Sequence, residues 1–322
     1  MKLITFEDIA SLNIKPSVCF DWAEETLVHK SETILPPKIS MKPTDGVFCN
    51  VMPSILHTNE HSSGGCKLVT RYPDRVPSLQ SRILLMDASN GEFLAFMDGT
   101  WITAMRTGAV AAHSILLLAK KNFANIGMMG LGNTVRATLL ILLDKMAEIG
   151  DDRILNIKLF RYKNQAEDFQ ARFSGYENLR FTVVDTYEEM VRGSDVVVSG
   201  ATYLPQDIVG DDCFDKGVLV VPIHTLGFTN CDLFFDEVFG DDYGHEEHFK
   251  NFQRFKFYAE VADVMAGKVP GRENDDERIL AYNVGISLQD VNFANHIYHA
   301  LEDAGAVLPE IDMLDPTDKF WV

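Results

Sequence analysis

The sequence predicts an α/β protein in which a sheet-rich α+β part precedes a doubly wound parallel sheet. Short apolar segments broken by turn residues fill positions 36–97, which is typical of an antiparallel sheet. From about residue 112, continuous apolar runs alternate with helical stretches, which indicates parallel strands covered by helices on both faces. A chain of 322 residues also exceeds what one ordinary core needs, so we expect two domains.

The first domain is expected to begin with helices and continue as a sheet. Residues 6–30 form two amphipathic helical pieces, which Pro16 separates because proline breaks a helix interior. Asn90-Gly91 is a strong hairpin signal between the last two β-like segments. These segments are predicted at residues 47–52, 67–72, 82–87 and 93–97.

The second domain is expected to alternate strands and helices. An apolar helix from Gly108 to Ala119 leads into it, and a helix from Val135 to Met146 follows its first strand. A last helix, residues 288–305, returns to the first domain. The predicted parallel strands are 125–129, 154–160, 180–184, 195–199 and 217–221. We therefore predict a first domain of residues 1–111 and 291–322, and a second of residues 112–290.

Composition excludes several classes of partner. The formal net charge of −18 argues against nucleic acid, whose phosphates call for basic patches. No apolar run of 20 residues predicts a membrane span, and acidic residues occupy the place of a signal-peptide core. The 5 cysteines are odd in number and show no CxxC spacing, so we expect reduced thiols, a cytoplasmic location and no metal site.

A glycine-rich turn follows the first predicted parallel strand. Gly130-Leu131-Gly132 lies between this strand and a helix, where a backbone free of side chains approaches a pyrophosphate at the helix N-terminus. Val135 occupies the third glycine position, so the fingerprint is incomplete. The prediction is a Rossmann dinucleotide site; a purely structural turn is the alternative.

The end of the second parallel strand bears on cofactor choice. Sites for NAD place an acid there, whereas sites for NADP place a cation near the extra phosphate. Here Phe160 is followed by Arg161 and Lys163, with no acid before Glu167. We predict NADP(H) as the preferred cofactor, with NAD(H) possible; an ordinary solvated basic loop is the alternative.

Three cations are candidates for binding a carboxylate. Lys67 lies in an apolar strand, and a buried lysine calls for an anion. Arg106 opens the apolar helix, where a cation opposes the helix dipole and an anionic partner relieves it. Lys38 is the third candidate. For Lys67 alone, a solvated strand face is the alternative interpretation.

Other polar residues give weaker signals. His224 follows the fifth parallel strand and is either a proton donor or a histidine satisfied by backbone groups. The acidic segment 236–248 contains two histidines, and its charge density favours a solvated helix start over a metal site. Asp290, in the last helix, is expected to cap or bridge near a subunit interface.

Several short motifs stand in a characteristic order. They are Val51-Met-Pro53, Lys67-Leu-Val-Thr, Asp98-Gly-x-x-Ile-Thr-x-x-Arg-Thr-x-Ala, Gly-x-Gly, Ala201-Thr202 and Gly267-x-x-Pro-Gly-Arg-Glu-x-Asp-Asp-Glu277. Together they cover nearly the whole chain and resemble the ornithine cyclodeaminase/mu-crystallin family. The resemblance implies a homodimer with a sheet-rich substrate-binding and dimerisation domain and an inserted NAD(P)-binding domain. It also implies cyclodeamination, amino-acid dehydrogenation or ketimine reduction.

The resemblance assigns roles residue by residue. The substrate carboxylate is bound by Lys67, Arg106 and Lys38, the last standing where the family has an arginine. The implied cofactor-binding residues are Thr107, Gly130, Leu131, Gly132, Asn133, Thr134, Arg161, Lys163, Ala201 and Thr202.

Two departures from the family pattern bear on the reaction. Asn50 and Thr229 stand where cyclodeaminases carry acids that bind the substrate amine and take its proton. We therefore predict an NAD(P)H-dependent oxidoreductase acting on the C–N bond of a small amino acid or ketimine carboxylate. Lys67, His224 and Thr229 are its predicted catalytic residues, and Lys38, Asn50, Lys67 and Arg106 its substrate-binding residues. An ornithine cyclodeaminase or a non-catalytic NADPH-binding protein is the alternative.

Overall fold

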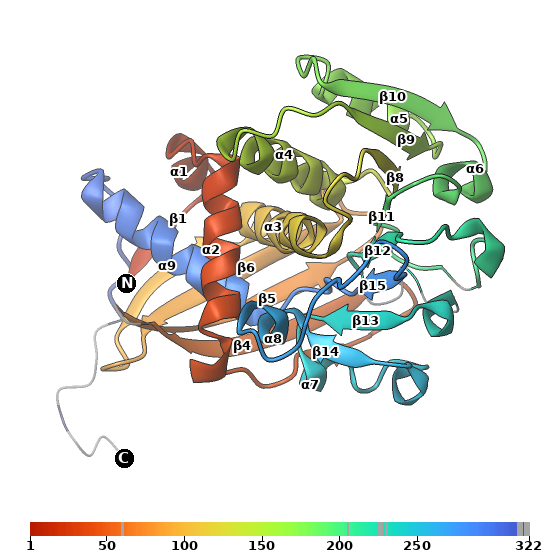
Figure 1. Cartoon of the computed structure of the whole chain (residues 1–322). Coiled ribbons are helices and arrows are strands. Elements are labelled where there is room, and N and C mark those ends of the chain that lie inside the picture. Colours follow the sequence, from red (N-terminus) through yellow and green to blue (C-terminus); the bar gives the residue numbers. More distant parts are fainter. Residues whose placement is uncertain (59–60, 205, 225–227, 229–230, 314–317, 319–322) are drawn as a thin grey trace.

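The computed structural model describes residues 1–58, 61–204, 206–224, 228, 231–313 and 318. Two sheets organise this part of the chain, with a group of helices packed between and around them (Figure 1). The α/β class predicted from the sequence is confirmed, since one sheet is largely antiparallel and the other is parallel throughout.

The first sheet has the strand order β1-β7-β6-β5-β4-β2, and β3 also pairs with β4. Every neighbouring pair is antiparallel except β1 with β7. Its strands are β1 (Lys2–Ile4), β2 (Thr33–Ile34), β3 (Ile39–Met41), β4 (Phe48–His57), β5 (Ser62–Arg71), β6 (Leu79–Asp87) and β7 (Phe93–Asp98). The Asn90-Gly91 turn joins β6 to β7 as predicted, with Gly91 at φ +84°.

The second sheet is parallel in every pairing and has the order β10-β9-β8-β11-β12-β15-β13-β14. The sequence predicts five of these strands, and it misses β13, β14 and β15. The strands are β8 (Asn125–Met129), β9 (Leu155–Phe160), β10 (Leu179–Val184), β11 (Val196–Ser199), β12 (Leu219–Pro222), β13 (Glu237–Gly240), β14 (Tyr258–Glu260) and β15 (Ile279–Ala281).

Helices pack against both sheets. They are α1 (Phe6–Ser11), α2 (Pro16–Val28), α3 (Thr100–Leu118), α4 (Asn133–Glu148), α5 (Gln165–Arg172), α6 (Tyr187–Val191), α7 (Tyr243–Glu246), α8 (Val261–Met265) and α9 (Ser287–Asp303). Single 3-10 turns are η1 (Lys30–Glu32), η2 (Asp211–Cys213), η3 (Cys231–Phe234) and η4 (Phe252–Arg254). Pro16 begins α2, where its missing N–H leaves no hydrogen bond unmade.

Helix α3 is the central connection. It contacts α2, α4 and α9 as well as β6 of the first sheet and β12 of the second. By length and composition it is apolar enough to cross a membrane, but most of it is buried inside the protein, as in a core helix. The domain boundaries predicted near residues 111 and 290 fall within α3 and α9, and this division stays a prediction.

The start of α3 differs from the prediction. The helix begins at Thr100, eight residues before Gly108, because Asp98 Oδ1 accepts the Thr100 backbone N–H at 2.7 Å and satisfies the first turn. Arg106 therefore lies in the body of the helix. The expectation that its charge opposes the helix N-terminal dipole was wrong, and its counter-charge has another origin.

Candidate active site

Lys67 and Lys38 lie on one face of the first sheet. Lys67 pairs with Met52 across β4 and β5. Ile39 pairs with Val51 in an antiparallel register, so the preceding residue, Lys38, lies opposite Met52. Lys38, Met52 and Lys67 therefore form one row across the sheet and point to the same face. Lys67 is fully buried although it stands in the middle of a strand. The alternative that it occupies a solvated face is wrong.

A carboxylate joins two of the predicted cations. Asp290 Oδ2 lies 2.6 Å from Lys67 Nζ, and Asp290 Oδ1 accepts the Arg106 Nε hydrogen bond at 2.8 Å. All three side chains are buried, and they come from β5, α3 and α9. A charge in this setting requires a partner, because desolvation otherwise disfavours it strongly. Asp290 is thus the counter-charge that the sequence did not identify.

The remaining positive charge sets the electrostatics of the site. Burial, followed by the charge of Arg106, lowers the pKa of Lys67 to about 7. Burial and Arg106 also lower the pKa of Lys38. Asp241 and Glu246 act in the opposite sense on Lys38. The three cations lie close enough to repel one another, and an anionic ligand would relieve this repulsion.

The Arg106 guanidinium is held from one side and has an unused donor. Its Nη1 is buried with no hydrogen-bond partner among the described residues. Gly285, at φ +76°, packs directly against the same nitrogen, so that an added Cβ would lie only 1.5 Å from it. Close backbone approach and positive φ both require glycine here. A ligand carboxylate would satisfy this orphaned donor.

Two buried carboxyl groups adjoin this site. Asp241 Oδ2 accepts the Gly285 backbone N–H at 2.6 Å, which fixes the loop that contacts Arg106. Glu246 accepts hydrogen bonds from the Asp241 N–H at 3.0 Å and the Tyr258 hydroxyl at 3.0 Å. Burial raises the pKa of Asp241, and burial together with Asp241 raises that of Glu246. The prediction of a solvated helix start over residues 236–248 was wrong for its buried members.

The other predicted catalytic and substrate residues have different placements. His224 follows β12, and burial with the nearby charges of Lys38 and Arg106 lowers its pKa to about 4. Asn50 lies in β4 opposite Val69, two residues before Met52, so it points to the same face as Lys67. Its buried Oδ1 has no hydrogen-bond partner among the described residues. Thr229 lies outside the described residues, so its role stays a prediction.

The glycine-rich turn has the geometry of a phosphate-binding loop. Gly130 has φ +65°, and a Cβ there would lie 2.3 Å from the Gly200 carbonyl carbon. At Gly132 an added Cβ would meet only Gly130 O, at 3.9 Å. Gly132 is the N-cap of α4 and offers no side chain to cap the helix. The turn is thus tight towards the sheet and open where an anion would meet the helix N-terminus.

Arg161 is exposed at the end of β9 and pairs with two acids. Its Nε donates to Asp185 Oδ1 at 2.7 Å, and its Nη1 donates to Glu167 Oε1 at 2.9 Å. Lys163 follows at φ +51°, with its ammonium 5.3 Å from the Tyr162 ring centroid. The basic residues are present at the predicted place, but Arg161 is shared with protein carboxylates.

The remaining predicted cofactor residues lie around the same edge of the parallel sheet. Ala201 and Thr202 follow β11 after Gly200, and Asn133 and Thr134 begin α4. The Thr107 hydroxyl, by contrast, donates to Thr103 O at 2.7 Å within α3. Nearby, a cavity of about 380 Å³ is lined by Phe160, Asp185, Thr186, Tyr187, Glu188, Ile208, Val209, Gly210 and Cys213.

One cluster of acids has the composition of a metal site. Carboxylate oxygens of Glu237, Glu273 and Glu277 lie within 4.8 Å of one another. Glu277 is already engaged, since it accepts the Glu273 N–H at 2.8 Å and the Asn274 side-chain amide at 2.6 Å. Burial and Glu277 raise the pKa of Glu237 to about 7. Glu277 thus holds the loop, whereas Glu237 Oε2 is buried without a hydrogen-bond partner among the described residues.

Comparison with known proteins places this site within a family. A dinucleotide turn on a parallel sheet, beside a buried cluster of cations on a second sheet, defines a dinucleotide-binding protein for small anionic ligands. The family model of the ornithine cyclodeaminase/mu-crystallin family matches residues 3–305. The chain belongs to this family, and the resemblance stated from the motifs is confirmed.

Individual relatives cover most of the chain. A nodulation efficiency protein of Rhizobium meliloti is 26% identical over 95% of this chain and 97% of its own length. A Delta(1)-pyrroline-2-carboxylate reductase of Bacillus cereus is 24% identical over 79% of this chain and 82% of its own.

Solved structures share the fold. The Thermococcus litoralis Delta(1)-pyrroline-2-carboxylate reductase, in complex with NADH and L-proline, has a TM-score of 0.82 at 22% identity and covers 97% of this chain and 100% of its own. An archaeal alanine dehydrogenase dimer with bound NAD has a TM-score of 0.83 at 22% identity, covering 98% and 99%.

Proposed function

We propose that this protein is an NAD(P)H-dependent oxidoreductase that reduces the C=N bond of a small ketimine carboxylate, or oxidises the corresponding amino acid. The observation that carries the proposal is the pair of buried cations Lys67 and Arg106, which share the carboxylate of Asp290 and lie close to the half-buried Lys38. Relatives named as reductases and dehydrogenases of such compounds support it.

The three cations are proposed to bind the substrate carboxylate. Arg106 offers Nη1, which has no hydrogen-bond partner in the described part of the chain, and Lys38 and Lys67 add positive charge from the sheet. Holding the carboxylate fixes the adjacent imine carbon in one orientation. In well-oriented reactions this effect lowers the activation barrier by about 7 kcal/mol or more. Asn50, one row from Lys67, is proposed to contact the substrate nitrogen side.

Lys67 is the proposed proton donor. Its pKa of about 7 means that both protonation states are available near neutrality, which suits a general acid. His224, with its pKa lowered to about 4, carries no extra proton at pH 7, so we assign it to lining the site. Asp290 would hold the Lys67 ammonium in place and would take no part in the proton transfer.

The residues of the glycine turn fit a bound dinucleotide. The open face at Gly132 and the uncapped N-terminus of α4 would bind the pyrophosphate, with Thr134 and Ala201 beside it. When bound, the nicotinamide supplies or accepts the hydride. The chain's own contribution is to orient the substrate carbon and to hold the proton on Lys67.

We further propose a preference for NADP(H) over NAD(H). Arg161 and Lys163 stand where the extra phosphate would lie, and no carboxylate occupies the position directly after β9. A phosphate with nearly two negative charges would compete with Asp185 and Glu167 for the Arg161 guanidinium.

We also propose that the protein is a homodimer and that it is located in the cytoplasm. The face of the first sheet opposite Lys67 is apolar and partly exposed, with Ile39, Met41 and Leu68 each at least 46% exposed. A second copy of the chain would cover it, as the alanine dehydrogenase with the same fold is a dimer. The cytoplasmic location rests on the cysteines, all of which are free thiols.

The proposed reaction is tested by following NADPH and NADH consumption with a cyclic ketimine carboxylate such as Δ1-piperideine-2-carboxylate. Turnover that favours NADPH supports the reductase and the cofactor preference together. Proline and ammonia formed from ornithine without net cofactor change would replace the proposal by a cyclodeaminase. Tight NADPH binding with no turnover on either substrate would leave a binding protein.

A further inference from the structure

We infer that His245 is a positioning residue that holds Lys38, the third cation of the carboxylate site, in its working place. The inference rests on the proposed function, because it concerns how that site is built. The Lys38 backbone N–H donates to His245 Nε2 at 3.2 Å. His245 is buried and belongs to α7 of the second sheet's domain, whereas Lys38 directly precedes β3 of the first.

The hydrogen bonds determine the tautomer of His245. Because Nε2 accepts from Lys38, the ring proton lies on Nδ1 and donates to Asp242 Oδ2 at 2.7 Å. Asp242 also accepts the His245 backbone N–H at 3.1 Å, which fixes the start of α7. The imidazole, held in one orientation, therefore presents its acceptor to the Lys38 backbone.

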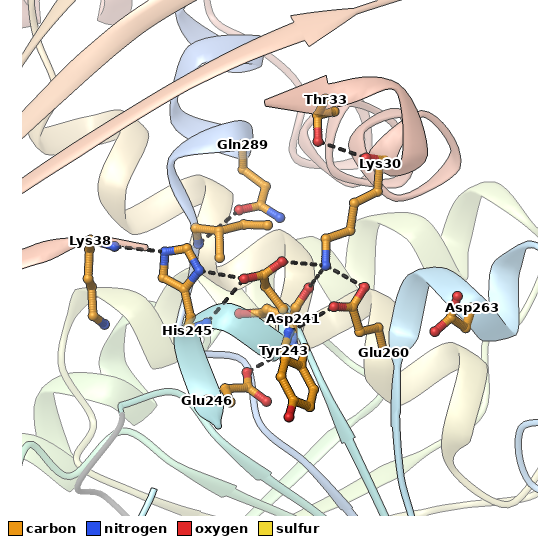
Figure 2. Close-up of polar contacts among 12 residues, drawn as sticks. Lys30, Thr33, Lys38, Asp241, Tyr243, His245, Glu246, Glu260, Asp263 and Gln289 are labelled. Carbon is orange, nitrogen blue, oxygen red and sulfur yellow. Dashed lines mark hydrogen bonds and ion pairs between the residues drawn. The ribbon is translucent and has the colours of Figure 1, made fainter. Parts of the chain in front are cut away.

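Asp242 is anchored in turn by Lys30, whose side chain is 9% exposed. Figure 2 shows the Lys30 ammonium directed towards Glu260. Lys30 Nζ lies 2.8 Å from Asp242 Oδ1 and 2.5 Å from Glu260 Oε2, and it donates to Asp241 O at 2.8 Å. Lys30 belongs to η1, which precedes β2. The chain of contacts Lys30, Asp242, His245 and Lys38 thus joins both ends of the segment 30–38 to α7.

The segment before Lys38 depends on such an attachment. Pro36 and Pro37 carry no backbone N–H, so Lys38 supplies the first donor after residue 35. Helix α7 also packs against this segment, since a Cβ added at Gly244 would lie 3.5 Å from Pro37 Cγ. The position of the Lys38 backbone is therefore set by α7.

Repulsion inside the site explains why an attachment is needed. Burial and then the charge of Arg106 lower the pKa of the Lys38 ammonium, against the opposing influence of Asp241 and Glu246, so Arg106 repels Lys38 when no ligand is bound. A flexible Lys38 segment would move away from Arg106. Holding the backbone through His245 keeps the cation in place and lowers the entropy lost when a carboxylate binds.

Two substitutions separate the acceptor from the donor of His245. In H245N the shorter amide can still donate to Asp242 but no longer reaches Lys38; in H245Q the amide oxygen can replace Nε2 as the acceptor. Calorimetric titration of the NADP+-bound protein with L-proline as the carboxylate probe measures the effect. We expect roughly five- to tenfold weaker L-proline binding in H245N, recovery in H245Q, and unchanged NADP+ affinity.

Controls make the outcome specific. H248N changes an exposed histidine that lies three residues after His245, and it should leave L-proline binding unchanged. In a K38M background, H245N should add nothing further, because the two residues act through one contact. Equal L-proline affinity in H245N and wild type, or a full additional loss in the K38M background, would overturn the inference. Failure of the wild-type holoprotein to bind L-proline would instead overturn the proposed carboxylate site, and this inference with it.

Discussion

Asp290 Oδ2 lies 2.6 Å from Lys67 Nζ in a fully buried setting, and its other oxygen accepts from Arg106. The pair joins α9, near the end of the chain, to the middle of β5. The proposed carboxylate site is thus part of the protein's core, so we expect stability and substrate binding to depend on the same groups. Substitutions at different members of the site can separate the effect on stability from the effect on binding.

Removing the charge of Asp290 should destabilise the fold. In D290N both Lys67 and Arg106 lose their counter-charge while remaining buried, and breaking a buried pair in this way costs about 3–5 kcal/mol of unfolding free energy. Urea unfolding measures the change. D303N, at the exposed end of the same helix, is the matched control and should lie within about 0.5 kcal/mol of wild type. A D290N protein as stable as wild type would show that the pair is not essential.

Arg106 should act on substrate and not on cofactor. R106A should raise KM for the ketimine about 100-fold, because a charge-assisted contact is lost, while KM for NADPH stays unchanged. R106K keeps the charge but loses the planar fork, so a smaller rise of about tenfold is expected. Steady-state kinetics with each substrate varied in turn provides the measurement. An equal rise in both KM values would remove Arg106 from the carboxylate site.

The reaction should depend on pH through Lys67. Its ammonium is the acid in the reductive direction, and its pKa is lowered to about 7, so the active, protonated form is lost as pH rises through that value. The kcat/KM for reduction should be highest below about pH 7 and fall above it. K67R, whose guanidinium stays protonated, serves as the control for titration of the substrate itself. A profile identical in K67R and wild type would exclude Lys67 as the group observed.

Gly285 should tolerate no side chain. G285A places a Cβ 1.5 Å from Arg106 Nη1 and must displace the guanidinium, so the ketimine KM should rise about tenfold or more. G305A is the matched control, since Gly305 has a similar φ of +66° with nothing within 4 Å of an added Cβ. Both variants carry backbone strain of about 1–2 kcal/mol, but only G285A should change KM. Similar kinetics in the two variants would count against the close contact.

Arg161 should distinguish the cofactors. R161A should raise KM for NADPH about 10- to 100-fold and leave KM for NADH unchanged, because only NADPH carries the 2′-phosphate. D185N releases Arg161 from one of its two acids and should lower the NADPH KM. The two variants thus shift the NADPH-to-NADH ratio in opposite directions. If neither shifts it, the proposed preference has no basis in Arg161.

Local sequence signals were sufficient for the fold and for part of the site. Continuous apolar strands and the Asn90-Gly91 turn identified both sheets, since each signal lies within one element. Lys67 was a candidate because a buried lysine calls for an anion, and Arg106 because of a helix-dipole argument that the structure overturns. The family resemblance assigned both residues to the site. The start of α3 was missed because Asp98 begins the helix through a side-chain contact that its apolar pattern does not reveal.

Long-range pairings were beyond the reach of the sequence. Asp290 lies 184 residues from Arg106 along the chain, and nothing near it marks it as the counter-charge of the site. Asp241, His245 and Glu246 read as solvated charge in an acidic segment, yet the packing of α7 buries all three. Their roles depend on tertiary contacts with Gly285, Lys38 and Tyr258.

The most direct test of the central claim is transfer of deuterium from C4-labelled NADPH to Δ1-piperideine-2-carboxylate, followed by mass spectrometry of the product. The account predicts consumption of one labelled cofactor for each product, with a single deuterium at the former imine carbon. Release of ammonia and formation of proline from ornithine, without labelled pipecolate and without net NADPH oxidation, would contradict it.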